Sequence, residues 1–155
     1  SLIHSASRWV VAVTAAFALA AGVAGTALAA PGDAKTAETA APIAVSSTPV
    51  PVSGMIAGDS GGSFAYYAYS YPGDSVLQTV TISIDSDNFE VANAVGVSLW
   101  LNGNEIGNLN ALGEQPGTNS LTFSSTDTGQ LLVQVWNYSD TTVNYTVTVT
   151  PASGS

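Results

Sequence analysis

Regular alternation of apolar and small or polar residues, over most of the chain after Val52, is the feature that most limits the fold. Successive side chains of a β-strand point to opposite faces, so a period of two predicts strands with one buried face. Threonine, valine and tyrosine, which recur in these runs, also suit a pleated sheet. The clearest runs are residues 80–84, 95–101, 121–123, 131–135 and 143–149.

Turn-forming residues separate these runs. Asn102-Gly103 is the strongest hairpin signal, because both residue types tolerate positive φ. Further turns are expected at Pro72-Gly73-Asp74, Asp85-Ser86-Asp87, Pro116-Gly117 and Asp127-Thr128-Gly129. The spacing predicts an all-β fold, an antiparallel β-sandwich of about seven or eight short strands over residues 52–150, followed by a tail at 151–155. No helix is expected after Ala30.

The first 29 residues are predicted to be a secretory signal peptide. Arg8 precedes a largely apolar run, and Ala27-Leu28-Ala29 has the small side chains that signal peptidase requires. Cleavage after Ala29 would make the protein secreted and extracellular. The alternative is a retained helical anchor, because the apolar run is almost long enough to span a bilayer. Residues 30–51 are rich in proline, alanine and threonine, which predicts a flexible linker.

Charge is distributed very unevenly along the 155 residues. The chain has 11 acidic residues, and its basic groups are only His4, Arg8 and Lys35. The predicted β domain, with nine acids and no cation, cannot neutralise phosphates, which argues against nucleic-acid binding. An anionic membrane would also repel the chain once the signal is removed.

The residue inventory also argues against catalysis. After signal cleavage the chain has no His, Cys or Arg, so Ser-His-Asp and Cys-His nucleophilic systems lack a base. A histidine-based zinc site is excluded for the same reason. The remaining carboxylates fall mainly at predicted turns, where solvent keeps them ionised. We therefore expect a protein that is not an enzyme and has no catalytic residue.

Aromatic side chains are the first candidates for ligand binding. Tyr67, Tyr69 and Tyr71 share one face of a predicted strand, and Trp100 and Trp136 fall on faces opposite their neighbouring core valines and leucines. Exposed aromatic rings could stack on sugars or on a protein partner. The alternative is that these rings fill the interior of the sandwich or lie under a loop.

An oxygen-rich segment is the second candidate site. Asp85, Asp87 and Glu90 could together hold calcium, as loops of secreted sandwiches do. The spacing is not that of an EF-hand, and the alternative is a solvated turn. No other cofactor is expected.

Two stretches resemble bacterial pre-peptidase C-terminal (PPC) domains. The first is Gly62-Ser-Phe-Ala-Tyr-Tyr-Ala-Tyr-Ser-Tyr-Pro-Gly-Asp74, and the second runs from Gly129 to Tyr138 and is followed by Asn144-Tyr-Thr-Val-Thr-Val149. The resemblance covers roughly residues 54–150. It implies a secreted β-sandwich that is non-catalytic and usually accompanies an exported enzyme.

Three functions follow as hypotheses. The first is a non-catalytic extracellular interaction module of PPC type, which binds protein or polymer at the cell surface. The second is a carbohydrate-binding module that uses exposed aromatic residues. The third is a structural subunit of an extracellular filament or matrix, assembled by edge-strand pairing. The expected partner is thus an extracellular protein or a polysaccharide.

Overall fold

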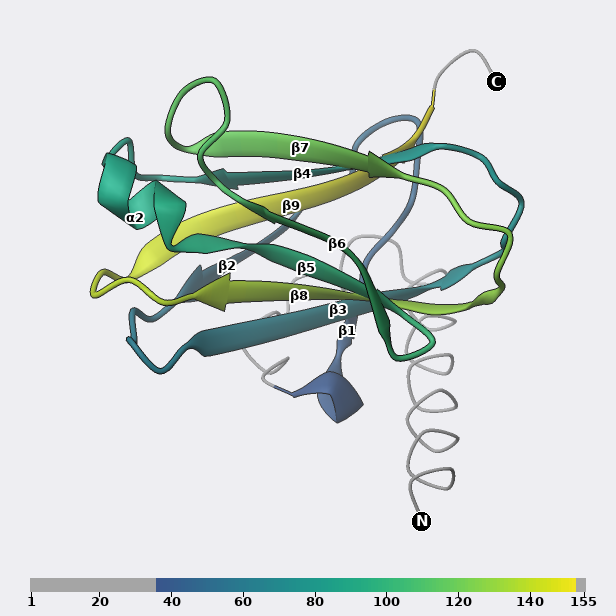
Figure 1. The fold of residues 1–155 in the computed structure, drawn as a ribbon, viewed down its shortest axis with the longest axis horizontal. Coiled ribbons are helices and arrows are strands. Elements are labelled where there is room, and N and C mark those ends of the chain that lie inside the picture. Colours follow the sequence, from purple (N-terminus) through teal and green to yellow (C-terminus); the bar gives the residue numbers. More distant parts are fainter. Residues whose placement is uncertain (1–35, 153–155) are drawn as a thin grey trace.

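The computed structural model describes residues 36–152, which form two β-sheets packed face to face (Figure 1). One sheet has five strands in the order β1-β3-β8-β5-β6, and the other has four in the order β2-β9-β4-β7. All neighbouring strands are antiparallel except β1 and β3. The strands are β1 (Ala41–Pro42), β2 (Val52–Ile56), β3 (Ser63–Tyr71), β4 (Gln78–Ile84), β5 (Val95–Leu101), β6 (Asn104–Asn110), β7 (Thr118–Phe123), β8 (Gly129–Asn137) and β9 (Val143–Pro151).

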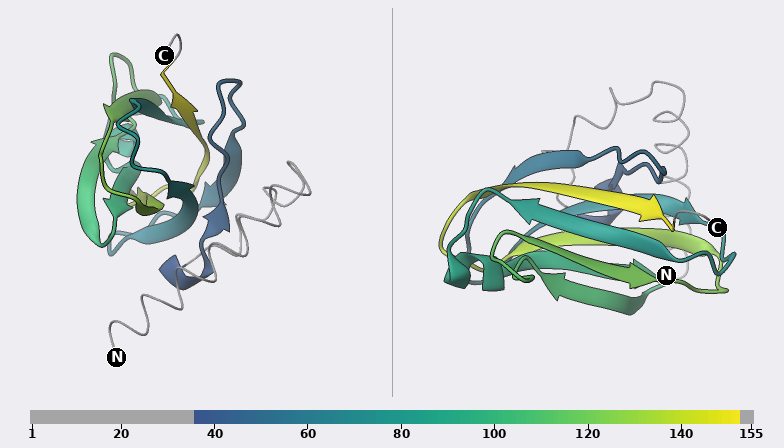
Figure 2. Two further views of the ribbon diagram at one scale, coloured as in Figure 1. Left: turned by 90° about the vertical axis from the view of Figure 1, so that its right-hand side faces the viewer. Right: turned by 90° about the horizontal axis from the view of Figure 1, so that it is seen from above.

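The core lies between the two sheets, and the predicted sandwich is confirmed. Seen end-on, the sheets curve around a common interior (Figure 2). The alternating apolar residues point inward: Val133 and Val135 of the central strand β8 are fully buried, as are Val147 and Val149 of β9. Their burial provides most of the stabilisation available to residues 36–152, which contain no Lys, Arg or His and so form no ion pairs between side chains.

The predicted hairpin at Asn102-Gly103 joins β5 to β6. Both residues have positive φ, 53° for Asn102 and 84° for Gly103. This is the backbone that a two-residue turn needs to match the twist of the flanking strands. The turn fixes the register in which β6 becomes the outer strand of the five-stranded sheet.

The flexible linker predicted for residues 30–51 is wrong at residues 41–45. Ala41 and Pro42 form β1, which pairs in parallel with Tyr67 and Ala68 of β3. Ile43 is fully buried in the core, and Val45 then bridges to β9 in the other sheet. Residues 41–45, called the strap below, therefore cross from one sheet to the other. Because the surrounding residues are rich in proline and alanine, the sequence did not indicate that Ile43 belongs to the core.

Two short helical segments were not expected from the sequence. Segment η3 (Ala37–Thr39) is a single 3-10 turn, and α2 (Phe89–Asn93) follows β4. Asn88 caps α2 by accepting a hydrogen bond from the Val91 amide, which lets five residues form a helix too short to show periodicity. Among the described residues, no helix has the length and hydrophobicity to cross a membrane. The predicted signal peptide lies outside the described residues.

Candidate functional site

The three tyrosines of β3 line the core. Tyr67, Tyr69 and Tyr71 are each at most 2% exposed, so they cannot stack on a ligand at the surface. Each phenol has a partner within the fold: Tyr67 bonds Tyr145, Tyr69 donates to Gln78, and Tyr71 bonds the backbone of Ser125. The alternative given for them, that they fill the interior, agrees with this burial.

The two tryptophans lie on the outer face of the five-stranded sheet, as their alternation predicted. We call this surface the aromatic–amide face. Strand register sets its side chains in rows: Phe64 pairs with Trp136, Tyr66 with Gln134, and Gln134 with Ser98 of the next strand. The face consists of Phe64, Tyr66, Ser98, Trp100, Asn108, Gln134 and Trp136, with Tyr138 just beyond β8.

A glutamine holds two of these rings in place. The Trp100 indole N–H donates to Gln134 Oε1 at 3.0 Å, and Gln134 Nε2 donates to the Tyr66 hydroxyl at 3.1 Å. The bonds link three adjacent strands: β5, β8 and β3. Because Gln134 uses both ends of its amide, the rings of Trp100 and Tyr66 are preorganised on the surface.

Trp136 lies across Gly96 of the neighbouring strand. A Cβ at Gly96 would come within 2.6 Å of the indole and 2.1 Å of the Leu109 carbonyl, so only glycine leaves this space. The indole N–H reaches Ser98 Oγ at 3.1 Å. Asn108 donates to the same oxygen and to Glu105, which carries the polar network out to the edge strand β6.

Ring contacts extend the face beyond the sheet. Tyr138 packs edge-on against Phe64, with ring centroids 5.8 Å apart, and its ring is tilted against that of Trp136, with centroids 5.7 Å apart. It remains 46% exposed, so its ring is available to a partner. On the other side the face ends where Ala37 and Ala40 cover Ala68 and Leu132. The result is a polar–aromatic platform bounded by η3.

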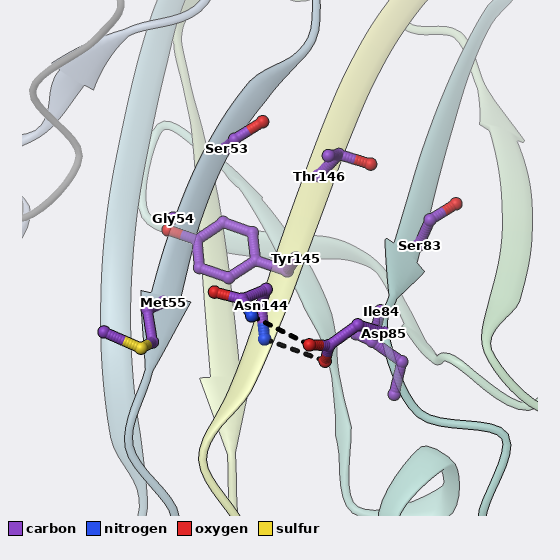
Figure 3. A pocket seen from close by; sticks show the side chains of 9 residues that line it. All are labelled: Ser53, Gly54, Met55, Ser83, Ile84, Asp85, Asn144, Tyr145 and Thr146. Atoms are coloured by element: carbon purple, nitrogen blue, oxygen red, sulfur yellow. Dashed lines mark hydrogen bonds between the residues drawn. The ribbon is translucent and has the colours of Figure 1, made fainter.

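A groove of about 610 Å³ lies on the outer side of the other sheet (Figure 3). It is lined by residues of β2, β9 and the end of β4, and we call it the Asp85 groove. Asp85 accepts two hydrogen bonds from Asn144, from the backbone amide at 3.0 Å and from the side-chain amide at 2.8 Å. These bonds, the side-chain bond first, lower the pKa of the exposed Asp85 carboxyl.

The three carboxylates expected to bind calcium do not gather around one point. Asp85 is turned toward Asn144, whereas Glu90 lines a separate hollow of about 400 Å³ with Asp140 and Tyr138. Between residues 36 and 152, no three acidic side chains lie close enough together to hold a metal ion. The geometry therefore does not support a calcium site formed by Asp85, Asp87 and Glu90.

Most members of the aromatic–amide face were not singled out from sequence. Phe64 and Tyr66 alternate with the buried tyrosines, so both faces of β3 looked equally aromatic. Gln134 meets Tyr66 across 68 residues of chain, and only the strand register brings them together. The position of Gln134 between the inward-facing Val133 and Val135 was the one sequence signal that placed it on the outer face.

No family model matches the chain, and no curated protein matches it. It is similar to the solved pre-peptidase C-terminal domain of a collagenase from Bacillus anthracis, with 12% identity, 71% of this chain and 95% of that chain covered, and a TM-score of 0.45. It is also similar to the Yersinia pseudotuberculosis-derived mitogen (16% identity, 70% and 89% covered, TM-score 0.47). A third similar structure is the periplasmic inhibitor of g-type lysozyme from Aeromonas hydrophila, with 15% identity, 72% of this chain and 97% of that chain covered, and a TM-score of 0.42. Similarities this low identify neither a family nor a ligand for this chain.

Proposed function

We propose that the protein is a secreted, non-catalytic module that binds polysaccharide through the aromatic–amide face. The observation that carries this proposal is the hydrogen-bonded set Trp100–Gln134–Tyr66, which holds two rings on an open sheet surface. Aromatic rings stack on the apolar faces of sugars, while neighbouring hydroxyl and amide groups bond sugar hydroxyls.

Preorganisation supports a binding role over simple packing. The indole N–H groups of Trp100 and Trp136 already have acceptors within the sheet, so neither must find a partner in the ligand. A ligand meets rings whose orientation is fixed in advance, which reduces the entropy lost on binding. Glu105 is exposed and can accept further hydrogen bonds, and the Tyr66 hydroxyl, which accepts a bond from Gln134, still has its own proton to donate.

The absence of catalytic chemistry is part of the proposal. Residues 36–152 contain no His, Cys, Lys or Arg, so the sequence provides no general base near neutral pH other than carboxylates. PPC-type membership and an extracellular location are proposed together with this role, from the motifs and the signal sequence described above.

The test is titration of the protein that remains after signal cleavage with soluble polysaccharides. Tryptophan fluorescence reports on Trp100 and Trp136, and calorimetry gives the affinity. Trp136→Ala and Tyr138→Ala should each weaken binding by roughly tenfold or more, as loss of a stacking ring does.

Phe89→Ala is the matched control, because Phe89 is a 62% exposed aromatic residue on α2, outside this face. It should leave the affinity unchanged. Equal affinities for Trp136→Ala, Tyr138→Ala and the wild type would overturn the proposed use of this face.

A further inference from the structure

The outer side of the four-stranded sheet carries a second regular surface. Three strands present only serine and threonine at nine positions in register, which we call the hydroxyl face. Pairing sets them in three rows: Thr122–Thr79–Thr150, Ser120–Thr81–Thr148 and Thr118–Ser83–Thr146. Some of the hydroxyls bond one another, Thr81 to Ser120 at 2.7 Å and Ser83 to Thr118 at 3.1 Å.

The third row leads into the Asp85 groove. Thr146 is also paired with Ser53 of β2, so hydroxyls continue across the fourth strand. Figure 3 shows Ser53, Thr146 and Ser83 at one end of the groove and the Asp85–Asn144 pair further along it. The hydroxyl face alone could reflect the preference of threonine for exposed strands. The adjoining groove of about 610 Å³ adds a concave surface at its edge.

The chemistry of this surface selects its ligand. Hydroxyls both donate and accept hydrogen bonds, and Asn144 Oδ1 accepts no hydrogen bond from the residues that the structure describes. Met55, opposite Asn144 in the register, is 65% exposed and offers an apolar contact for the C–H side of a sugar ring. Asp85 is the single charge in the groove, and no cation lies between residues 36 and 152, so an anionic polymer would be repelled.

From these observations, we infer that the Asp85 groove and the hydroxyl face bind a chain of neutral polysaccharide, at a site separate from the aromatic–amide face. The two sites lie on the outer sides of opposite sheets. If the proposed function also holds, one domain can contact two polymer chains at once and bridge them. This bridging rests on the proposed function, whereas the inference that the groove binds polysaccharide does not.

Three soluble polymers with related backbones and different charge test the ligand class by calorimetry. Hydroxyethyl cellulose is neutral, carboxymethyl cellulose is anionic and glycol chitosan is cationic. Binding is measured in the Trp136→Ala background, in which binding at the aromatic–amide face is expected to be weaker by roughly tenfold or more. Measurable binding to hydroxyethyl cellulose and none to carboxymethyl cellulose is the expected result, while glycol chitosan, whose positive charge is attracted to the acidic domain, measures the contribution of charge alone. Binding to glycol chitosan alone, or to none of the three, would overturn the inference.

Substitutions in the groove locate the site. In the Trp136→Ala background, Asn144→Ala should weaken binding to hydroxyethyl cellulose by roughly tenfold, because it removes one amide from the groove. Thr146→Arg, at an exposed position, should block the groove sterically without touching the core. Asn104→Ala, an exposed asparagine on β6 of the other sheet, is the matched control and should leave the affinity unchanged. Thermal melts confirm that each variant is folded.

The same variants separate failure of this inference from failure of the proposed function. If Trp136→Ala alone abolishes all binding, the groove does not bind the polymer, and the proposed function stands. If Asn144→Ala and Thr146→Arg abolish binding while Trp136→Ala has no effect, the groove is the site and the aromatic–amide face is not. If both faces bind, light scattering should show the wild type increasing the size of the polymer particles, and either single-face variant should not.

Discussion

The phenolic oxygens of Tyr67 and Tyr145 lie 2.6 Å apart in the core and join the two sheets by a hydrogen bond. Tyr67 belongs to β3 of the five-stranded sheet and Tyr145 to β9 of the other. Both side chains are at most 2% exposed, so neither hydroxyl can exchange its partner for water. Each hydroxyl therefore has the other as its hydrogen-bond partner in the core.

Removal of one of these hydroxyls should be costly. Tyr67→Phe or Tyr145→Phe leaves the remaining hydroxyl buried without its partner, and we expect each change to lower the free energy of unfolding by about 1–3 kcal/mol. The double variant should lose less than the sum of the two, because no orphaned hydroxyl remains. Urea unfolding measures all three. Tyr138→Phe, at an exposed tyrosine, should not change stability, and strictly additive losses would contradict the coupling.

Alkaline pH should destabilise the fold through the same residues. Burial raises the pKa of the Tyr67 and Tyr69 hydroxyls far above the usual value, and that of Tyr145 is raised for the same reason. In the unfolded chain these groups lose their protons near pH 10, whereas the folded state keeps them protonated. The contribution of these tyrosines to stability should thus be constant below about pH 10 and fall as pH rises beyond it.

Unfolding measured between pH 8 and pH 11.5 checks this dependence. The Tyr67→Phe/Tyr145→Phe double variant has two fewer buried groups to ionise, so its loss of stability above pH 10 should be shallower than that of the wild type. The same slope in both proteins would show that other groups cause the alkaline transition.

The sequence was sufficient for the class of fold and for most faces of most strands. Regular alternation placed Val133 and Val135 inside and Trp100 and Trp136 outside, because a strand offers only two faces and apolar residues favour one of them. Alternation failed at β3, where both faces are aromatic, so the period could not tell which set faces the core.

Contacts between residues far apart in the chain could not be predicted from the sequence. Asp85 lies within five residues of Asp87 and Glu90, which suggested a common site, but its carboxylate instead bonds Asn144, 59 residues further on. The strap was missed for a related reason. Pro42 and the small residues around it are typical of a linker, and nothing local shows that Ile43 enters a space between β3 and β9.

The strap should contribute directly to stability. Ile43→Ala removes a fully buried side chain and should cost about 2–5 kcal/mol, the usual range for such a core truncation. Leu77→Ala is the control, because Leu77 is 46% exposed and its loss should change stability little. Urea unfolding distinguishes the two residues. If Ile43→Ala is as stable as Leu77→Ala, residues 41–45 behave as a linker in solution.

Acid should weaken the link between Asp85 and Asn144. The pKa of Asp85 is lowered in the folded state, chiefly by the Asn144 side-chain amide, so below the ordinary value of about 4 the unfolded chain binds more protons than the folded one. The contribution of Asp85 is present above that pH and is lost as pH falls through the folded pKa. Asp85→Asn should therefore make the decline of stability between pH 5 and pH 2 shallower. Asn144→Ala removes the side-chain amide that bonds Asp85 and should make the decline shallower in the same way.

Calcium should have no specific effect on stability. The ten carboxylates between residues 36 and 152 repel one another with no cation to offset them, so salt of any kind should raise the melting temperature by screening. A calcium site would add a saturable effect at low concentration, because it would exist only in the folded state. Such a site needs several oxygens directed at one point, yet both Asp85 oxygens accept hydrogen bonds from Asn144. Melts at constant ionic strength, with millimolar calcium or with chelator, should therefore coincide. Separate curves that merge in Asp87→Asn or Glu90→Gln would instead establish a calcium site at this loop.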